Sequence, residues 1–200
     1  MSGENPALAL YAAHGAALAE RYETVAPAQL FAPVADLLPV APARVADLGA
    51  GSGRDAAWFA GQGHQVTAVE PVNELREAAR LRHVDAGIDW VADQLPGLAG
   101  LEGRRFDLLL LIAVWHHLDG LQRQEAMGRL RDLSADGAHV VLSLRHGPEQ
   151  PKSGVFAADV EGTISLAEAN GFRVLRRVEA EAQQRQDAAG INWTWLVLAA

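Results

Sequence analysis

The chain has 200 residues, of which 50% are hydrophobic and 21% are charged, a balance typical of one ordinary globular domain. Lys and Arg number 17 and Asp and Glu number 25, and the resulting net charge of −8 disfavours nucleic acid or an anionic membrane surface as a partner. The chain contains no cysteine, which excludes disulfides, thiolate metal sites, iron–sulfur clusters and cysteine nucleophiles.

The first part of the chain, residues 1–42, predicts helices that belong to the same domain as the core, residues 43–200. Residues 7–22 are rich in Ala and Leu and predict one helix. A second helix is expected over 27–38, because prolines stand at its start and just beyond its end. No basic region precedes an apolar run at the beginning, and the longest apolar run, 106–115, is shorter than the about 20 residues of a membrane helix. We therefore expect a soluble, cytoplasmic protein.

The core alternates short apolar runs with helical segments, which predicts a largely parallel sheet with helices on both faces. Asn73 is a candidate N-cap, and Asp136 and Gly137 are expected to form a turn. The last two strands are joined by a loop, 179–191, and so are expected to pair antiparallel at the sheet edge. The expected strands are 44–48, 66–70, 88–91, 106–112, 138–144, 172–178 and 193–198, and the expected helices are 54–62, 74–82, 122–133 and 160–169.

A glycine-rich turn follows the first expected strand, in the segment Asp-Leu-Gly-Ala-Gly-Ser-Gly over 47–53. Glycines at such a place let a ligand approach the backbone, and Glu70 at the end of the next strand is placed to bind a ribose. A dinucleotide fingerprint needs a small residue at the sixth position from Gly49, and this chain has Arg54 there. A nicotinamide-dependent oxidoreductase stays open as an alternative, but Arg54 at this position disfavours it.

Several motifs in order resemble the class I S-adenosylmethionine-dependent methyltransferases. The glycine-rich turn and Glu70 are similar to the family's first motif and its ribose-binding acid, and Asp93 is similar to the acid that meets the adenine amino group. The segments 106–118 and 136–143 resemble its fourth strand with the active-site turn and its fifth strand. The resemblance implies a three-layer α/β sandwich with a seven-stranded, mostly parallel sheet in the order 3-2-1-4-5-7-6, strand 7 being antiparallel, and with an N-terminal helical lid.

The resemblance also implies a set of residues for S-adenosylmethionine and its product S-adenosylhomocysteine. Asp47 and Arg54 are candidates for the methionine end, with helix capping and plain exposure as their alternatives, and Arg21 and Tyr11 are candidates for the inside of the lid. The expected cofactor residues are Asp47, Gly49, Ala50, Gly51, Gly53, Arg54, Glu70, Pro71, Asp93, Gln94, Leu95, Ala113, Arg21 and Tyr11.

Two histidines follow the fourth expected strand, at the edge where open α/β sheets bind ligands. His116 and His117 are candidates for a general base, and His146 beyond the fifth strand is a further one; a structural histidine is the alternative. Trp115 and Arg145 are candidates for acceptor contact, although a buried tryptophan is more often a core residue. Adjacent histidines lack metal-ligand spacing, so no metal site is expected.

These features together predict direct displacement of a methyl group onto an N, O or S atom of a small-molecule acceptor, in which the protein supplies proximity and orientation. A non-catalytic protein that keeps the cofactor pocket is a second alternative. The absence of an Asn/Asp-Pro-Pro-aromatic turn after the fourth strand disfavours amide and adenine nitrogens as acceptors. Both a monomer and a homodimer are compatible with the sequence.

Overall fold

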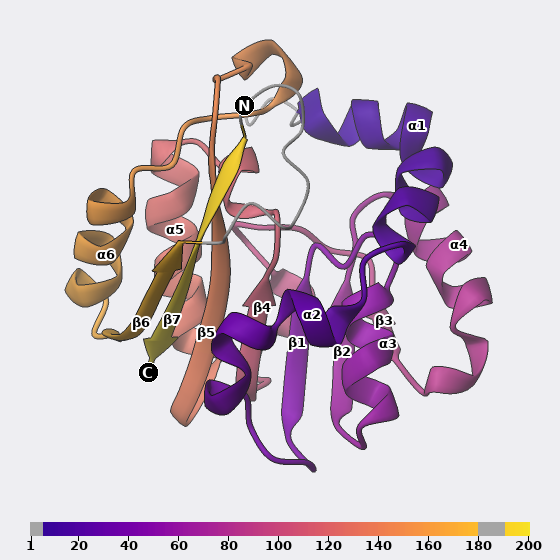
Figure 1. Cartoon of the computed structure of the whole chain (residues 1–200), viewed down its shortest axis with the longest axis horizontal. Helices are drawn as coiled ribbons and strands as arrows, with labels where there is room; N and C mark the ends of the chain where they lie inside the picture. The colour runs from indigo at the N-terminus through magenta and orange to yellow at the C-terminus, as the bar shows by residue number, and fades with distance from the viewer. Residues whose placement is uncertain (1–5, 180–190) are drawn as a thin grey trace.

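The computed structural model describes residues 6–179 and 191–200, and its centre is one twisted sheet (Figure 1). The strands lie in the order β3-β2-β1-β4-β5-β7-β6, with β7 antiparallel to both of its neighbours. This confirms the predicted fold class and strand order. The predicted loop 179–191 falls almost entirely outside the described residues. The strands are β1 (Arg44–Leu48), β2 (Gln65–Val69), β3 (Asp89–Val91), β4 (Phe106–Leu111), β5 (Ser134–His146), β6 (Arg173–Glu179) and β7 (Asn192–Ala199).

Helices cover both faces of the sheet (Figure 1). No helix in the described parts of the chain has the length and apolar character that crossing a bilayer requires. The α-helices are α1 (Pro6–Glu23), α2 (Pro27–Leu30), α3 (Arg54–Gly61), α4 (Asn73–Arg82), α5 (Gly120–Leu133) and α6 (Val160–Ala169). Short 3-10 segments are η1 (Ala32–Leu37), η2 (Val84–Ala86), η3 (Ala99–Leu101), η4 (Trp115–His117) and η5 (Pro151–Ser153).

The central strand β4 is buried on both faces, as its near-continuous apolar run predicts. Leu109 packs with Met127 of α5 in one cluster, whereas Leu108 packs with Phe59 of α3 in the other. Alternate residues of a strand point to opposite faces, so one apolar run holds both layers of helices. Each fully buried leucine contributes about 1.5–3 kcal/mol relative to an exposed one. This rigid centre places the carboxyl ends of β1 and β4 side by side.

Three local predictions differ from the structure. The helix expected over 27–38 is broken into α2 and η1, because Pro33 has no N–H to donate and its ring opposes the carbonyl four residues earlier. Asn73 does not cap α4; Val72 is the N-cap residue, and the Asn73 side chain instead accepts from Arg76 at 2.8 Å. The turn at residues 136–137 is a bulge inside a longer β5, since Ser134 opposes Phe106 and the regular pairing resumes at Leu108.

Helix α1 crosses beyond one end of the sheet and packs on α4 (Figure 1). Gly15 makes this approach possible, because a Cβ at that position would lie 2.8 Å from Leu75. Ala19 of α1 joins the same small apolar cluster as Leu75 and Val72. The packing of α1 on α4 therefore sets a helix across the edge at which β1 and β2 end.

Candidate active site

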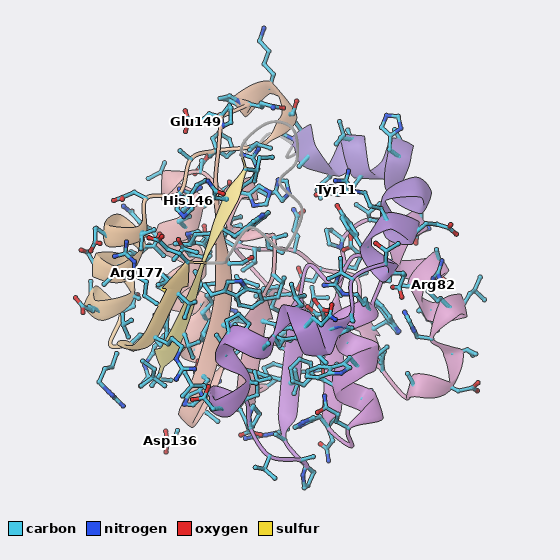
Figure 2. The ribbon with its side chains drawn as sticks, in the orientation of Figure 1. Tyr11, Arg82, Asp136, His146, Glu149 and Arg177 are labelled. Atoms are coloured by element: carbon cyan, nitrogen blue, oxygen red, sulfur yellow. The ribbon has the colours of Figure 1, made fainter. Side chains whose placement is uncertain are left out.

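A cavity of about 300 Å³ lies at the carboxyl ends of β1, β2 and β4 and under α1. Its walls come from the segments that follow these strands, from Tyr11 and Tyr22 of α1, and from Trp193 and Trp195 of β7. Figure 2 shows Tyr11 and His146 toward this end of the molecule and Asp136 toward the other end. The cavity is thus where a parallel sheet is expected to bind a ligand.

Two of the three glycines in the turn after β1 shape the cavity. Gly49 has φ +82° and lies so close to Val114 that an added Cβ would be 2.6 Å from that side chain. Gly51 has φ +55° and lines the cavity, where an added Cβ would meet only Tyr22, at 3.9 Å. Gly53 differs, because its Cβ position is filled by Trp90 at 2.7 Å and the residue is not among the described residues that line the cavity. Gly53 therefore serves packing rather than ligand contact.

Glu70 holds this turn from the end of β2. Its carboxylate accepts hydrogen bonds from the backbone N–H of Gly51 at 2.9 Å and of Val72 at 2.8 Å. The side chain is buried, and burial raises its pKa, against the two N–H donors that lower it. Each carboxylate oxygen retains a lone pair after these bonds, so Glu70 can also accept from ligand hydroxyls in the cavity.

Asp47 is a buried acid on the cavity wall. Its carboxylate accepts from the backbone N–H of Ala56, whereas its Oδ2 atom has no hydrogen-bond partner among the described residues. Burial, and then the nearby Asp55 carboxylate, raise the pKa of Asp47 from 3.8 to about 8. An unsatisfied buried carboxyl group costs stability unless a donor or a cation meets it. The cavity thus offers a place for a positively charged or N–H-bearing ligand group.

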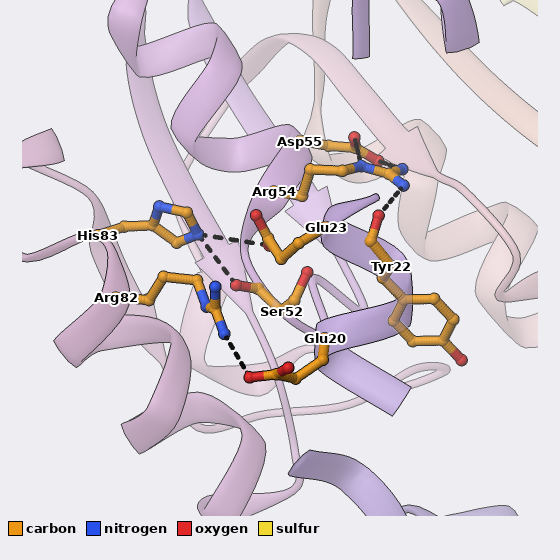
Figure 3. A network of polar contacts seen from close by, with 8 residues as sticks. All are labelled: Glu20, Tyr22, Glu23, Ser52, Arg54, Asp55, Arg82 and His83. Carbon is orange, nitrogen blue, oxygen red and sulfur yellow. Dashed lines mark hydrogen bonds and ion pairs between the residues drawn. The ribbon is translucent and has the colours of Figure 1, made fainter. Parts of the chain in front are cut away.

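Polar contacts tie the end of α1 to the glycine-rich turn (Figure 3). Arg54 donates to both oxygens of Asp55, at 2.8 and 2.9 Å, and to the Tyr22 carbonyl at 2.9 Å. His83 is the C-cap residue of α4. Its Nε2 atom lies 3.2 Å from the Ser52 carbonyl and 3.6 Å from a carboxylate oxygen of Glu23. Arg54 is therefore engaged inside the protein, and the expected pairing with a ligand carboxylate is not supported by its geometry.

The segments after β3 and β4 complete the wall of the cavity. Asp93 lines it and accepts from the N–H of Gln94 and of Gly100, both at 2.7 Å. Ala113 lines it with a left-handed φ of +58°, and its N–H donates to Ser143 Oγ at 2.8 Å. Ala50, Pro71, Gln94 and Leu95 also lie on the cavity wall, as expected. Arg21 is exposed and is not among the described lining residues.

Of the acceptor-side candidates, His117 alone reaches the described wall of the cavity. His116 is buried beside it, and burial, followed by the neighbouring His117, lowers its pKa to about 2. His146 is hydrogen-bonded to Thr194 Oγ1 at 2.7 Å. Trp115 is fully buried in the core, and Arg145 donates to the Pro148 carbonyl at 3.2 Å. His116, His146 and these last two are therefore not assigned to ligand contact.

Several lining residues were not candidates in the sequence analysis, among them Tyr22, Ser143 and Trp193. Tyr22 stands eleven residues after Tyr11, which is three helical turns, so the two rings share one face of α1. That spacing was readable in the sequence. Ser143 and Trp193 depend on the pairing of β5 with β7, which only the fold provides.

Comparison with known families identifies the fold. A family model described as a methyltransferase domain matches residues 20–199. The chain belongs to this methyltransferase family. Its members are S-adenosylmethionine-dependent enzymes of class I, as the motifs of the glycine-rich turn predict. Comparison with curated protein sequences gives no match.

Solved structures of methyltransferases share the fold of this methyltransferase. A TehB-like S-adenosylmethionine-dependent methyltransferase from Corynebacterium glutamicum has a TM-score of 0.69 at 18% identity, over 92% of this chain and 97% of that one. A 1,6-didemethyltoxoflavin-N1-methyltransferase from Burkholderia thailandensis has a TM-score of 0.66 at 21% identity, over 93% and 88%. The N-methyltransferase NodS from Bradyrhizobium japonicum, in complex with S-adenosyl-L-homocysteine, has 0.65 at 17%, over 90% and 86%.

Proposed function

We propose that this methyltransferase transfers a methyl group from S-adenosylmethionine to an N, O or S atom of a small molecule by direct displacement. The observation that carries the proposal is the cavity whose wall holds Glu70, the bare backbone of Gly51 and the unpaired Oδ2 atom of Asp47. When bound, the donor supplies a methyl group on a positively charged sulfur. The protein then has to bind, orient and exclude water, without a nucleophile of its own.

The residues of the cavity fit the parts of this donor. Glu70 retains acceptor capacity for the two ribose hydroxyls, and Asp47 has an unpartnered oxygen for the ammonium group of the methionine part. Asp93 is placed to accept from the adenine amino group, beside the backbone of Gln94 and Leu95. Arg54 acts in this scheme as a positioning residue that holds Tyr22 and Asp55.

A small acceptor suits this cavity better than a macromolecule. Its volume of about 300 Å³ lies at the lower end of the range of small-molecule sites, and residues of α1 line one side of it, which is consistent with a lid. The net charge of −8 opposes binding of nucleic acid. The compared structure from Burkholderia thailandensis holds the small molecule 1,6-didemethyltoxoflavin, which is consistent with this choice.

Calorimetry with S-adenosylhomocysteine tests the donor site. Glu70→Ala is expected to weaken binding about tenfold or more, because each charge-assisted hydrogen bond contributes about 1.5–3 kcal/mol. Glu74→Ala is the matched control, since Glu74 is an exposed acid on α4 that does not line the described wall of the cavity. Unchanged affinity in a folded Glu70→Ala variant, or binding of a nicotinamide dinucleotide in place of the adenosyl compound, would reject the proposal. Binding without methyl transfer to a broad acceptor panel would favour the non-catalytic alternative.

A further inference from the structure

Tyr11 and His117 form a hydrogen-bonded pair on the cavity wall. The Tyr11 hydroxyl lies 3.2 Å from His117 Nε2, and the rings meet edge to face with centroids 5.5 Å apart. Tyr11 comes from α1 and His117 from η4, which follows β4, so the pair joins the covering helix to the end of the sheet. Tyr22 of α1 lines the cavity beside this pair.

The second ring nitrogen decides the direction of these bonds. His117 Nδ1 lies 2.8 Å from the Gly154 carbonyl oxygen, which can only accept a hydrogen bond. The proton of the neutral ring therefore sits on Nδ1, and Nε2 accepts from the Tyr11 O–H. Burial lowers the pKa of His117, against the hydrogen bond to Gly154 that raises it, and Arg145 lowers it further, so the neutral ring with a free lone pair on Nε2 is favoured. Burial raises the pKa of Tyr11, which keeps its hydroxyl protonated.

The charges around the pair limit what an acceptor can carry. Arg54 is the only permanent cation among the described residues that line the cavity, and Asp55 already pairs with it. An acceptor carboxylate or phosphate would therefore find no unpaired cation on the described wall of the cavity. Arg145 is a nearby charge that lowers the pKa of His117, whereas the Glu70 carboxylate acts on Tyr11. A protonated amine would therefore be opposed by Arg145 at the His117 end of the pair.

Apolar side chains also line the cavity, among them Leu8, Val114, Leu118 and Trp193. An uncharged, flat acceptor would bury its apolar surface here and would present one polar hydrogen to the pair. A phenol meets these conditions, because it is neutral when it binds and needs to lose its proton to become a good nucleophile.

We propose that Tyr11 and His117 deprotonate a phenol-type acceptor, with Tyr11 relaying the proton to His117 Nε2, an inference that rests on the proposed methyltransferase function. The acceptor proton passes to Tyr11 Oη while the Tyr11 proton passes to Nε2. The acceptor oxygen forms its bond to the methyl carbon as the carbon–sulfur bond breaks and its electron pair returns to sulfur. The imidazolium that results later gives its proton to water. Tyr11 is thereby a catalytic residue on the acceptor side, rather than the donor contact expected from the sequence.

Methyl transfer to a series of para-substituted phenols, from p-cresol to p-nitrophenol, tests this assignment. Tyr11→Phe keeps the ring contact, and His117→Asn keeps an N–H for the Gly154 carbonyl but has no basic nitrogen. For p-cresol, kcat/KM is expected to fall about 100-fold in each variant, the usual contribution of a positioned base. For p-nitrophenol, which ionises unaided near neutral pH, the loss is expected to stay below about fivefold. His116→Phe, which alters the buried neighbour, is the matched control and is expected to leave the dependence on phenol acidity unchanged.

A binding measurement accompanies the kinetics. The wild-type protein with S-adenosylhomocysteine is expected to bind p-nitrophenol as its coloured phenolate, whereas the His117→Asn complex is expected to bind the neutral form. An equal loss for all phenols in both variants would show a merely structural role and overturn the relay. Wild-type methylation of benzylamine in preference to every phenol, or no transfer to any phenol, would overturn the acceptor class. If S-adenosylhomocysteine binds with Glu70-dependent affinity in these cases, the proposed donor site survives; if it does not bind, the proposed function itself fails.

Discussion

The carboxylate of Glu70 lies 2.9 Å from the backbone nitrogen of Gly51, so the acid that ends β2 holds the turn that follows β1. The same bond keeps the bare α-carbon of Gly51 on the cavity wall. One side chain thus both shapes the turn and retains acceptor capacity toward the cavity. Gly51 and Gly53 can be compared, because only at Gly53 would an added Cβ overlap a large side chain.

Alanine at Gly53 is expected to cost more stability than alanine at Gly51. Both residues have positive φ, +78° and +55°, so each substitution pays about 1–2 kcal/mol of backbone strain. The added Cβ at Gly53 also overlaps Trp90 at 2.7 Å, whereas at Gly51 the nearest atom is 3.9 Å away. Urea unfolding of the two variants measures the difference. Equal losses would mean that Trp90 moves aside freely.

Asp47→Asn is expected to flatten the pH dependence of stability. Burial raises the pKa of Asp47 from 3.8 to about 8, so between these values the folded protein keeps a proton that the unfolded chain has lost. The free energy of unfolding therefore falls as pH rises through this window, and the asparagine variant lacks that fall. Relative to the wild type, the variant should gain at least about 1 kcal/mol between pH 5 and pH 8. Parallel curves for the two proteins would contradict the raised pKa.

Substitution of Trp115 is expected to affect folding and not binding. The indole is fully buried in the core cluster, and removing it by Trp115→Ala should cost about 3–5 kcal/mol. Trp115→Phe should be milder, because it also removes an indole N–H that has no partner in the described structure. Affinity of the folded Phe variant for S-adenosylhomocysteine, measured by calorimetry, should equal that of the wild type. A clear loss of affinity would return Trp115 to the binding site.

Arg54→Lys is expected to loosen α1. A lysine cannot form the forked pair with Asp55 and reach the Tyr22 carbonyl at the same time. Hydrogen exchange over the described part of α1 should accelerate, and donor affinity should fall about fivefold or more, equivalent to about 1 kcal/mol. The control is Arg82→Ala, which removes an ion pair to Glu20 whose side chains are 42% and 78% exposed. Such exposed pairs contribute about 0.2–1 kcal/mol, so little change is expected there.

The strands and the donor side of the cavity were readable from the sequence because they follow from local patterns. A continuous apolar run predicts β4, and a glycine-rich turn with Glu70 after the next strand predicts the ligand edge. The places of His116 and His117 were not readable in this way. Two adjacent histidines leave a 3-10 turn in different directions, and which one faces the cavity depends on Gly154, distant in the sequence.

The position of Arg54 has a consequence for the order of events in catalysis. Its guanidinium follows the glycines that we propose to bind the donor, and it donates to the carbonyl of Tyr22 near the end of the helix that carries Tyr11. Binding of the adenosyl compound against those glycines would therefore also order the helix that carries the proposed acceptor-side hydroxyl. We expect compulsory-order kinetics in which the sulfonium compound enters first and the methylated product departs before the spent thioether.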